Sequence, residues 1–197
     1  MKHATTVILA GLLVLGSGTA LTKTKAGPVV VKRGTMTDKR NGTIYNTVTI
    51  GRQKWMAENL DYPLGSSWCY EGKAENCEKY GRLYAWNAAL KACPSGWHLP
   101  SDGEWQVLED ALEGDAKGLK VAKGWNGTDR YGFSVQPAGS RGGNGSFGRL
   151  GSGAYFWSAT EYAAQIAWYR YFRSGVGSVS SNCGYKTDGF SVRCLEN

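Results

Sequence analysis

The sequence contains few histidines, and this scarcity excludes several kinds of active site. Two histidines are present in 197 residues, and His3 lies at the N-terminus, which leaves His98 without a second histidine. Candidate glutamates stand far apart, so no carboxylate pair of glycosidase type is indicated. The glycine-rich stretch GSRGGNGSFG (139–148) lacks the Lys-Ser/Thr pair of a phosphate-binding loop. We therefore expect a protein that is not an enzyme and that needs no cofactor.

Clusters of positive charge and long apolar runs are also scarce. The formal net charge is +7, but lysine and arginine are spread along the chain, so we expect no nucleic-acid partner. The excess either keeps the protein soluble or weakly attracts acidic cell-surface polymers. The apolar run 6–16 is too short to span a bilayer, and no second run could cross one. We expect no stable membrane insertion.

The N-terminus has the features of a Sec signal peptide. A polar start precedes the apolar run, and Gly18 and Ala20 are small residues at the −3 and −1 positions of a cut after Ala20. We predict a signal peptide over 1–20, with an uncleaved N-terminal anchor as the alternative. Residues 21–36 are expected to form a flexible linker and residues 37–197 a single domain. The protein would then be extracellular, at the cell surface or in the periplasm.

The first half of the domain shows strand and helix patterns. NGTIYNTVTIG (41–51) opens with a turn signal and continues with period-two alternation, and 53–60 suits a partner strand. Good helix formers occupy 82–92, with an apolar stripe on one face. Ser101 and Glu104 form an S-x-x-E capping box that begins a second helix, which Gly114 ends.

The second half is rich in glycine and aromatic residues, which predicts short strands and long loops. The chain as a whole has 28 glycines, eight tryptophans and eleven tyrosines. Segments 166–175 and 189–197 are strand candidates, and 139–153 is expected to be a surface loop.

The cysteines number five, at positions 69, 77, 93, 183 and 194. In an exported protein most would form disulfides, and the odd count leaves one over. Cys69 and Cys77 lie eight residues apart in a turn-rich segment, so a local disulfide is expected between them.

Several ordered motifs resemble one known family. GRLYAWNAALKACPSGWHLPSDGEW is followed by AYFWSATEY and GFSVRC, and IGRQKWMAENLDY precedes them. This order is similar to the Fibrobacter succinogenes major paralogous domain, which occurs in exported bacterial proteins, and the resemblance covers about 37–197. More distantly, the pattern resembles C-type lectin-like domains. The resemblance implies an α+β fold, with two short helices packed on small antiparallel sheets and long loops rich in glycine and aromatic residues.

The lectin-like resemblance also implies a disulfide between Cys93 and Cys194, which leaves Cys183 over. A free thiol is the first interpretation of Cys183. Disulfide-mediated dimerisation and a redox or copper-linked role are the alternatives, the last suggested by formylglycine-generating oxidases of related fold. His98 would need cysteines as further zinc ligands, and these are assigned to disulfides, so we interpret His98 as a packing or turn residue.

The calcium motifs of sugar-binding lectins of this fold are incomplete here. Gln136-Pro137-Ala138 lacks the acidic third member, and Trp125-Asn126-Gly127 lacks a carboxylate. Because calcium prefers several oxygen ligands with carboxylates among them, we expect no metal site.

Aromatic residues of the second half are the candidate ligand-binding set. In AWYRYFR the residues alternate, so that one face should enter the core and the other present tyrosines and an arginine. The alternative is that these rings have a structural role only and fill a small twisted core. The candidate residues are Tyr155, Trp157, Trp168, Tyr169, Arg170, Tyr171, Arg173 and Tyr185.

The leading hypothesis is a non-enzymatic binding module of the bacterial surface or envelope. Its partner would be a polysaccharide or a surface protein, held by the aromatic region without calcium. A structural or assembly protein of the envelope is the alternative, and a formylglycine-generating type of oxidase is the third hypothesis.

Overall fold

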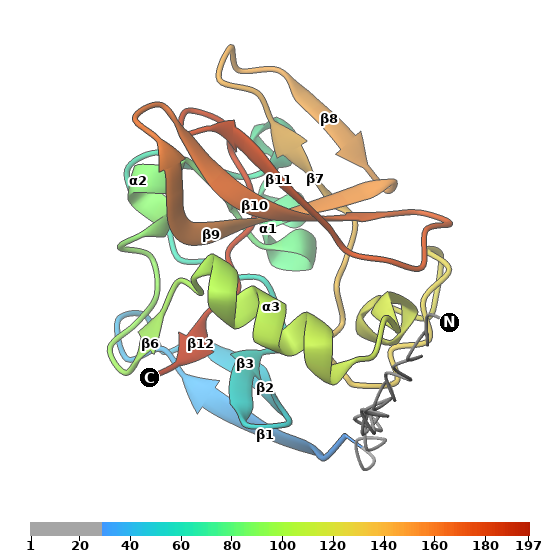
Figure 1. The fold of residues 1–197 in the computed structure, drawn as a ribbon. Helices are drawn as coiled ribbons and strands as arrows, with labels where there is room; N and C mark the ends of the chain where they lie inside the picture. The colour runs from blue at the N-terminus through green and yellow to red at the C-terminus, as the bar shows by residue number, and fades with distance from the viewer. Residues whose placement is uncertain (1–28) are drawn as a thin grey trace, which may run out of the picture.

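The computed structural model describes residues 29–197 and shows an α+β domain with two five-stranded sheets. Helix α3 (Asp102–Ala111) lies between them (Figure 1). No helix of the described part of the chain is both long and apolar enough to cross a bilayer. The predicted signal peptide, 1–20, lies outside the described residues.

The first sheet has the order β1-β2-β3-β12-β6, with every neighbouring pair antiparallel. Its strands are β1 (Val31–Thr37), β2 (Ile44–Ile50), β3 (Gln53–Met56), β12 (Leu195–Glu196) and β6 (Trp97–His98). The expected strand within 41–51 is therefore confirmed. The linker expectation is wrong for 31–36, because the whole of β1 pairs with β2 in continuous register. The side chains of β1 are mostly exposed, so its sequence lacks the alternating apolar pattern that would have indicated this pairing.

The second sheet has the order β11-β10-β9-β7-β8. Its strands are β7 (Ala138–Arg141), β8 (Phe147–Leu150), β9 (Gly153–Ala163), β10 (Ile166–Arg173) and β11 (Ser180–Tyr185). The strand expected within 166–175 is confirmed. The surface loop expected over 139–153 is instead largely the β7–β8 hairpin, whose turn is closed by a bond from the Gly142 amide to the Ser146 carbonyl.

The helix expected over 82–92 is wrong for most of its length. Leu83–Tyr84 form β5, which pairs with β4 (Ser67–Trp68), and only Trp86–Ala89 form a helix, α2. Tyr84 also exchanges backbone hydrogen bonds with Phe190, of 2.8 and 3.1 Å. Pairing with two distant segments overrides the local helix preference.

Shorter helical elements complete the fold. They are α1 (Ala74–Tyr80) and the 3-10 turns at Tyr70–Gly72 and Ala116–Leu119. The final segment, expected as a strand over 189–197, meets successive partners: Phe190 bridges Tyr84, Ser191 bridges Phe156, and only Leu195–Glu196 form a strand.

Helix α3 begins with the predicted capping box. The Ser101 hydroxyl accepts from the Glu104 amide, and the Ser101 amide donates to the Glu104 carboxylate at 2.7 Å. His98 lies 2.9 Å from the same carboxylate and 2.7 Å from the Asn197 side chain. The interpretation of His98 as a scaffold residue is thus confirmed by its contacts, which connect β6, α3 and the C-terminus.

This cap should make stability depend on pH. Burial acts to raise the pKa of Glu104, but the bonds from Ser101 and His98 lower it below its ordinary value of 4.5. A carboxylate with a lowered folded pKa contributes stability above its unfolded pKa and loses it as pH falls through the folded value. The free energy of unfolding should therefore decrease as the pH is lowered below about 4.5. Glu104→Gln should make this decrease smaller.

Urea denaturation at a series of pH values measures this dependence. Glu113→Gln, at the exposed opposite end of the helix, should keep the slope of the unmodified protein. A slope that Glu104→Gln leaves unchanged would contradict the role of the cap.

Both disulfides are formed. Cys69–Cys77 closes a separation of 8 residues, and Cys93–Cys194 closes one of 101. The second bond joins the segment after α2 to the residue before β12, as the lectin-like resemblance implies. Stable bonds of this kind indicate an oxidising, non-cytoplasmic compartment.

Removing the long-range disulfide should be the more destabilising change. In the chain-entropy model, Cys93→Ala with Cys194→Ala should lower the free energy of unfolding by about 4–5 kcal/mol, and Cys69→Ala with Cys77→Ala by about 2–3 kcal/mol. Urea denaturation followed by tryptophan fluorescence under non-reducing conditions compares the two pairs. Equal losses would show that loop length does not govern the effect.

Candidate ligand-binding face

The candidate aromatic residues lie on β9, β10 and β11, whose register places them on opposite faces of the second sheet. Phe156 faces Arg170 across β9 and β10, whereas Tyr155 pairs with Tyr171, and Trp157 with Tyr169. Since side chains alternate along a strand, Phe156 and Arg170 share the face toward α3. Tyr155, Trp157, Tyr169 and Tyr171 occupy the other face, which we call the tyrosine face. The candidate set is therefore split in two.

Arg170 is not available to a ligand. It is 1% exposed, and its guanidinium forms ion pairs with Asp102 and Glu109 of α3. It also donates to the Ser181 hydroxyl at 2.8 Å. The expectation that Arg170 contacts a ligand is wrong, because a buried guanidinium requires acidic partners and α3 supplies them.

Trp157 is also unavailable. Its side chain is fully buried, its ring lies 4.3 Å from that of Phe190, and its indole N–H donates to the Tyr84 carbonyl at 2.7 Å. The ring belongs to a core cluster with Tyr84 and Trp86. Its assignment to the ligand-binding set is wrong, because the ring fills the core, as the alternative interpretation of these aromatic residues expected.

The remaining rings of the tyrosine face are half-buried. Tyr155 stacks on Tyr171 with centroids 4.3 Å apart, and on Phe190 at 5.2 Å. Arg173 is exposed and lies 5.6 Å from the Tyr171 ring. Burial raises the pKa of Tyr155, assisted by its hydrogen bond with Tyr171, and burial also raises the pKa of Tyr169. Tyr155 and Tyr169 are half-buried and lie against neighbouring rings, so they serve mainly as packing groups.

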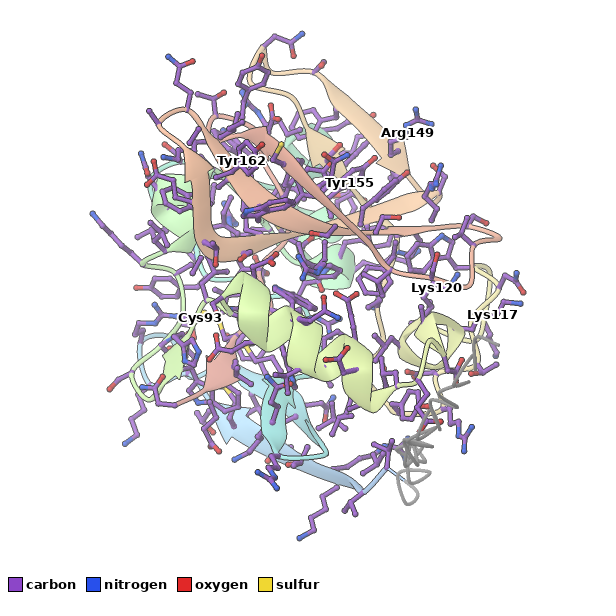
Figure 2. The ribbon with its side chains drawn as sticks, viewed as in Figure 1. Cys93, Lys117, Lys120, Arg149, Tyr155 and Tyr162 are labelled. Atoms are coloured by element: carbon purple, nitrogen blue, oxygen red, sulfur yellow. A yellow bond between two sulfur atoms is a disulfide. The ribbon has the colours of Figure 1, made fainter. Side chains whose placement is uncertain are left out.

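The most exposed aromatic side chains lie on the other face, near the β9–β10 turn. Tyr162 is 56% exposed and Tyr185 is 63% exposed. Trp168 is half-buried and meets Tyr162 edge to face, with centroids 5.1 Å apart. Figure 2 shows Tyr162 near one end of the sheet, away from Tyr155 and Arg149. We call Tyr162, Trp168 and Tyr185 the aromatic strip.

Strand register places Trp168 and Tyr185 on one face, and the ring contact with Trp168 places Tyr162 beside them. Ile166 pairs with Tyr185, and Trp168 pairs with Cys183. Helix α3 does not cover this part, since its N-terminus meets β9 earlier, where the Asp102 amide donates to the Thr160 hydroxyl. Sequence reasoning missed Tyr162. The available signal was the spacing of two residues between Thr160 and Tyr162 near the end of β9, since alternate residues of a strand share a face.

Cys183 is free and half-buried on β11, opposite Trp168. Because β11 is the edge strand of its sheet, this thiol lies beside the aromatic strip and not within the core. The prediction of a free thiol is confirmed within the chain.

A second buried arginine organises the opposite side of the domain. Arg193 is 1% exposed and donates to the Asn59 side chain at 2.7 Å and to the carbonyls of Met56, Phe133 and Ser134. Burial lowers the pKa of Arg193. These bonds connect β3 to the loop before β7, so we assign Arg193 a structural role that the sequence did not indicate.

Gln136, from the incomplete calcium triplet, lines a pocket of about 250 Å³ next to Arg193. Glu58 and Asp61 line it as well. Within residues 29–197 no three His, Cys, Asp or Glu side chains are arranged to hold a metal ion. The pocket offers mixed polar groups without a metal centre.

The model of the Fibrobacter succinogenes major domain matches residues 48–196. The chain belongs to this family. The match includes both disulfides and the aromatic strip, but it starts within β2, so β1 is an addition to the first sheet outside the matched region. No curated protein and no solved structure matches the chain.

The corrected role of Arg170 can be tested by stability. Arg170→Met leaves Asp102 and Glu109 without their buried partner, so the free energy of unfolding should fall by about 2–3 kcal/mol. Arg173→Met, on the same strand but exposed, should change it by less than about 0.5 kcal/mol. Urea denaturation gives both values. Equal stability of the two variants would contradict the structural assignment of Arg170.

Proposed function

We propose that this domain is an exported, non-enzymatic binding module that recognises polysaccharide through the aromatic strip, without calcium or another metal. The observation that carries the proposal is the exposure of two tyrosines beside a half-buried tryptophan on one sheet face. Aromatic rings combine a large apolar surface with a polar tip. They therefore suit the apolar C–H faces and the hydroxyl rims of sugar rings.

The rigidity of the strip supports the proposal. Trp168 and Tyr185 lie on paired strands of one sheet, and the edge-to-face contact with Trp168 restricts Tyr162. Side chains that are already ordered lose little conformational entropy when a ligand binds. Scattered surface aromatics are common, but three near one another at the end of a single sheet offer a larger contact surface.

We assign the fold to the C-type lectin-like class under the same proposal. Its support is the Cys93–Cys194 disulfide between the segment after α2 and the last strand, together with the order of α2 and α3 before the long irregular region. Export is proposed from the N-terminal signal pattern, and the two disulfides agree with an oxidising destination.

A structural role in envelope assembly is the second candidate. The free thiol of Cys183 favours it, since that thiol is half-buried on an edge strand and could form an intermolecular disulfide. A dimer that reductant or Cys183→Ser abolishes would support assembly over polysaccharide binding.

Polysaccharide binding can be tested by depletion assays with insoluble polysaccharides and by a glycan array. Tyr162→Ala with Tyr185→Ala should weaken binding about tenfold or more, since each lost stacking contact contributes about 1 kcal/mol. Tyr171→Ala tests the tyrosine face, and Ile44→Ala, an apolar side chain that is 65% exposed on the first sheet, is the matched control.

Both control variants should bind like the unmodified protein. Absence of binding to every polysaccharide, or binding that the double tyrosine variant retains, would refute recognition by the strip.

A further inference from the structure

A separate pocket of about 460 Å³ lies between β4 and the β7–β8 hairpin. Trp68, Arg82, Arg141, Gly145 and Phe147 are among its lining residues. Neither the aromatic strip nor the tyrosine face contributes to it. The hairpin that builds it is the glycine-rich stretch for which the sequence had indicated no role.

The guanidinium of Arg141 lies against the Trp68 ring, with Phe147 farther away. It lies 3.9 Å from the centroid of the Trp68 ring and 6.0 Å from that of Phe147. The close contact with Trp68 restricts the guanidinium and shields part of it from water. The N–H groups of a guanidinium point outward in its own plane, so stacking leaves them free for hydrogen bonds.

Those N–H groups have almost no partner. The only side-chain bond of Arg141 is a 3.3 Å contact with the Gly142 carbonyl, and no carboxylate of residues 29–197 pairs with it. In contrast, the buried Arg170 has two acidic partners. Arg141 is therefore a positioned cation whose counter-charge the described chain does not supply.

Gly145 leaves the free edge of this guanidinium open. Its φ is +91°, which favours glycine, and a Cβ at this position would stand 3.3 Å from Nη2 of Arg141. The turn of the hairpin thus brings backbone close to the arginine without a side chain that would crowd it.

The charges around the pocket favour an anion. Arg82 adds a second guanidinium, but it is ion-paired with Asp61 at 3.6 Å, so the unpaired positive charge of the lining is that of Arg141. The one acidic residue in the lining, Glu71, is paired with Lys73 at 2.9 Å. A planar guanidinium with a free edge matches a carboxylate, which can accept two parallel hydrogen bonds.

We infer that this pocket binds the carboxylate of an acidic sugar residue, with Arg141 as its principal anion ligand. The volume exceeds what a small inorganic anion needs, and the edges of Trp68 and Phe147 provide apolar surface for a sugar ring. The inference rests on the proposed function for the class of ligand, a polysaccharide, and specifies that the polysaccharide carries uronate groups. The net positive charge of the chain would assist the approach of such a polymer.

Titration calorimetry with galacturonate oligomers provides the test, and the methyl-esterified oligomers serve as the uncharged ligand. Arg141→Gln should weaken binding of the acid form by about ten- to hundredfold, because a charge-assisted bidentate contact is lost. Arg141→Lys should restore little, since an ammonium has no planar fork. Arg149→Gln, an exposed arginine on β8, makes the same change of charge and should alter binding less than about twofold.

Three results would overturn the inference. They are equal losses in Arg141→Gln and Arg149→Gln, equal affinity for the acid and the ester, and displacement of the oligomer by millimolar inorganic phosphate or sulfate, which would indicate a small-anion site. Gly145→Ala gives an independent check: it should weaken acid binding by crowding Nη2, and its thermal unfolding shows whether the hairpin persists. Loss of binding with the wild-type thermal midpoint supports the inference, and unchanged binding contradicts it.

The two sites can fail separately. If Arg141→Gln abolishes uronate binding while the double variant of Tyr162 and Tyr185 keeps all polysaccharide binding, the pocket is supported and the strip is refuted. If the tyrosine variants abolish binding to neutral polysaccharide while Arg141→Gln has no effect on acidic oligomers, the reverse holds.

Discussion

The packing of Trp105 between the two sheets is the contact on which the rest of the domain depends. Its indole on α3 lies 4.7 Å from the ring of Trp55 in the first sheet and 5.7 Å from the ring of Phe156 in the second. All three side chains are fully buried. Because the sheets share no strand, this helix helps to fix their relative position, together with the final segment, which bridges Phe156 through Ser191 before it joins the first sheet as β12. It also decides which part of the second sheet is covered and which part remains exposed.

Two buried arginines extend this arrangement in different ways. Arg170 joins the second sheet to α3 through carboxylates, whereas Arg193 joins β3 to a loop through neutral oxygen atoms. A buried charge is costly unless it is fully hydrogen-bonded, so each arginine restricts its partners to one arrangement. Arg141 differs because it lies against the Trp68 ring and no acid neutralises it. This difference separates structural arginines from a candidate ligand-binding one.

The features that the sequence predicted well are local. The capping box of Ser101 and Glu104 and the disulfide between Cys69 and Cys77 depend on residues only a few positions apart. The helix expected over 82–92 failed because Tyr84 pairs with Phe190, more than 100 positions away, which no local pattern reveals. Period-two alternation in β10 correctly placed residues on two faces. The alternation could not show that both faces of β10 are covered around Arg170, because the residues that cover them come from distant parts of the sequence.

The long-range disulfide was the exception, and its prediction came from family resemblance instead of local pattern. Resemblance transfers a pairing because it compares whole folds, but it could not locate the binding residues, where this chain lacks the lectin calcium motifs. The position of a side chain relative to α3 distinguishes packing residues from candidate binding residues. The side chains under the helix, including Arg170, maintain the domain, while Trp168, past its N-terminus, is only half-buried. Position beyond the helix therefore separates the candidate binding residues from the packing residues on the same strand face.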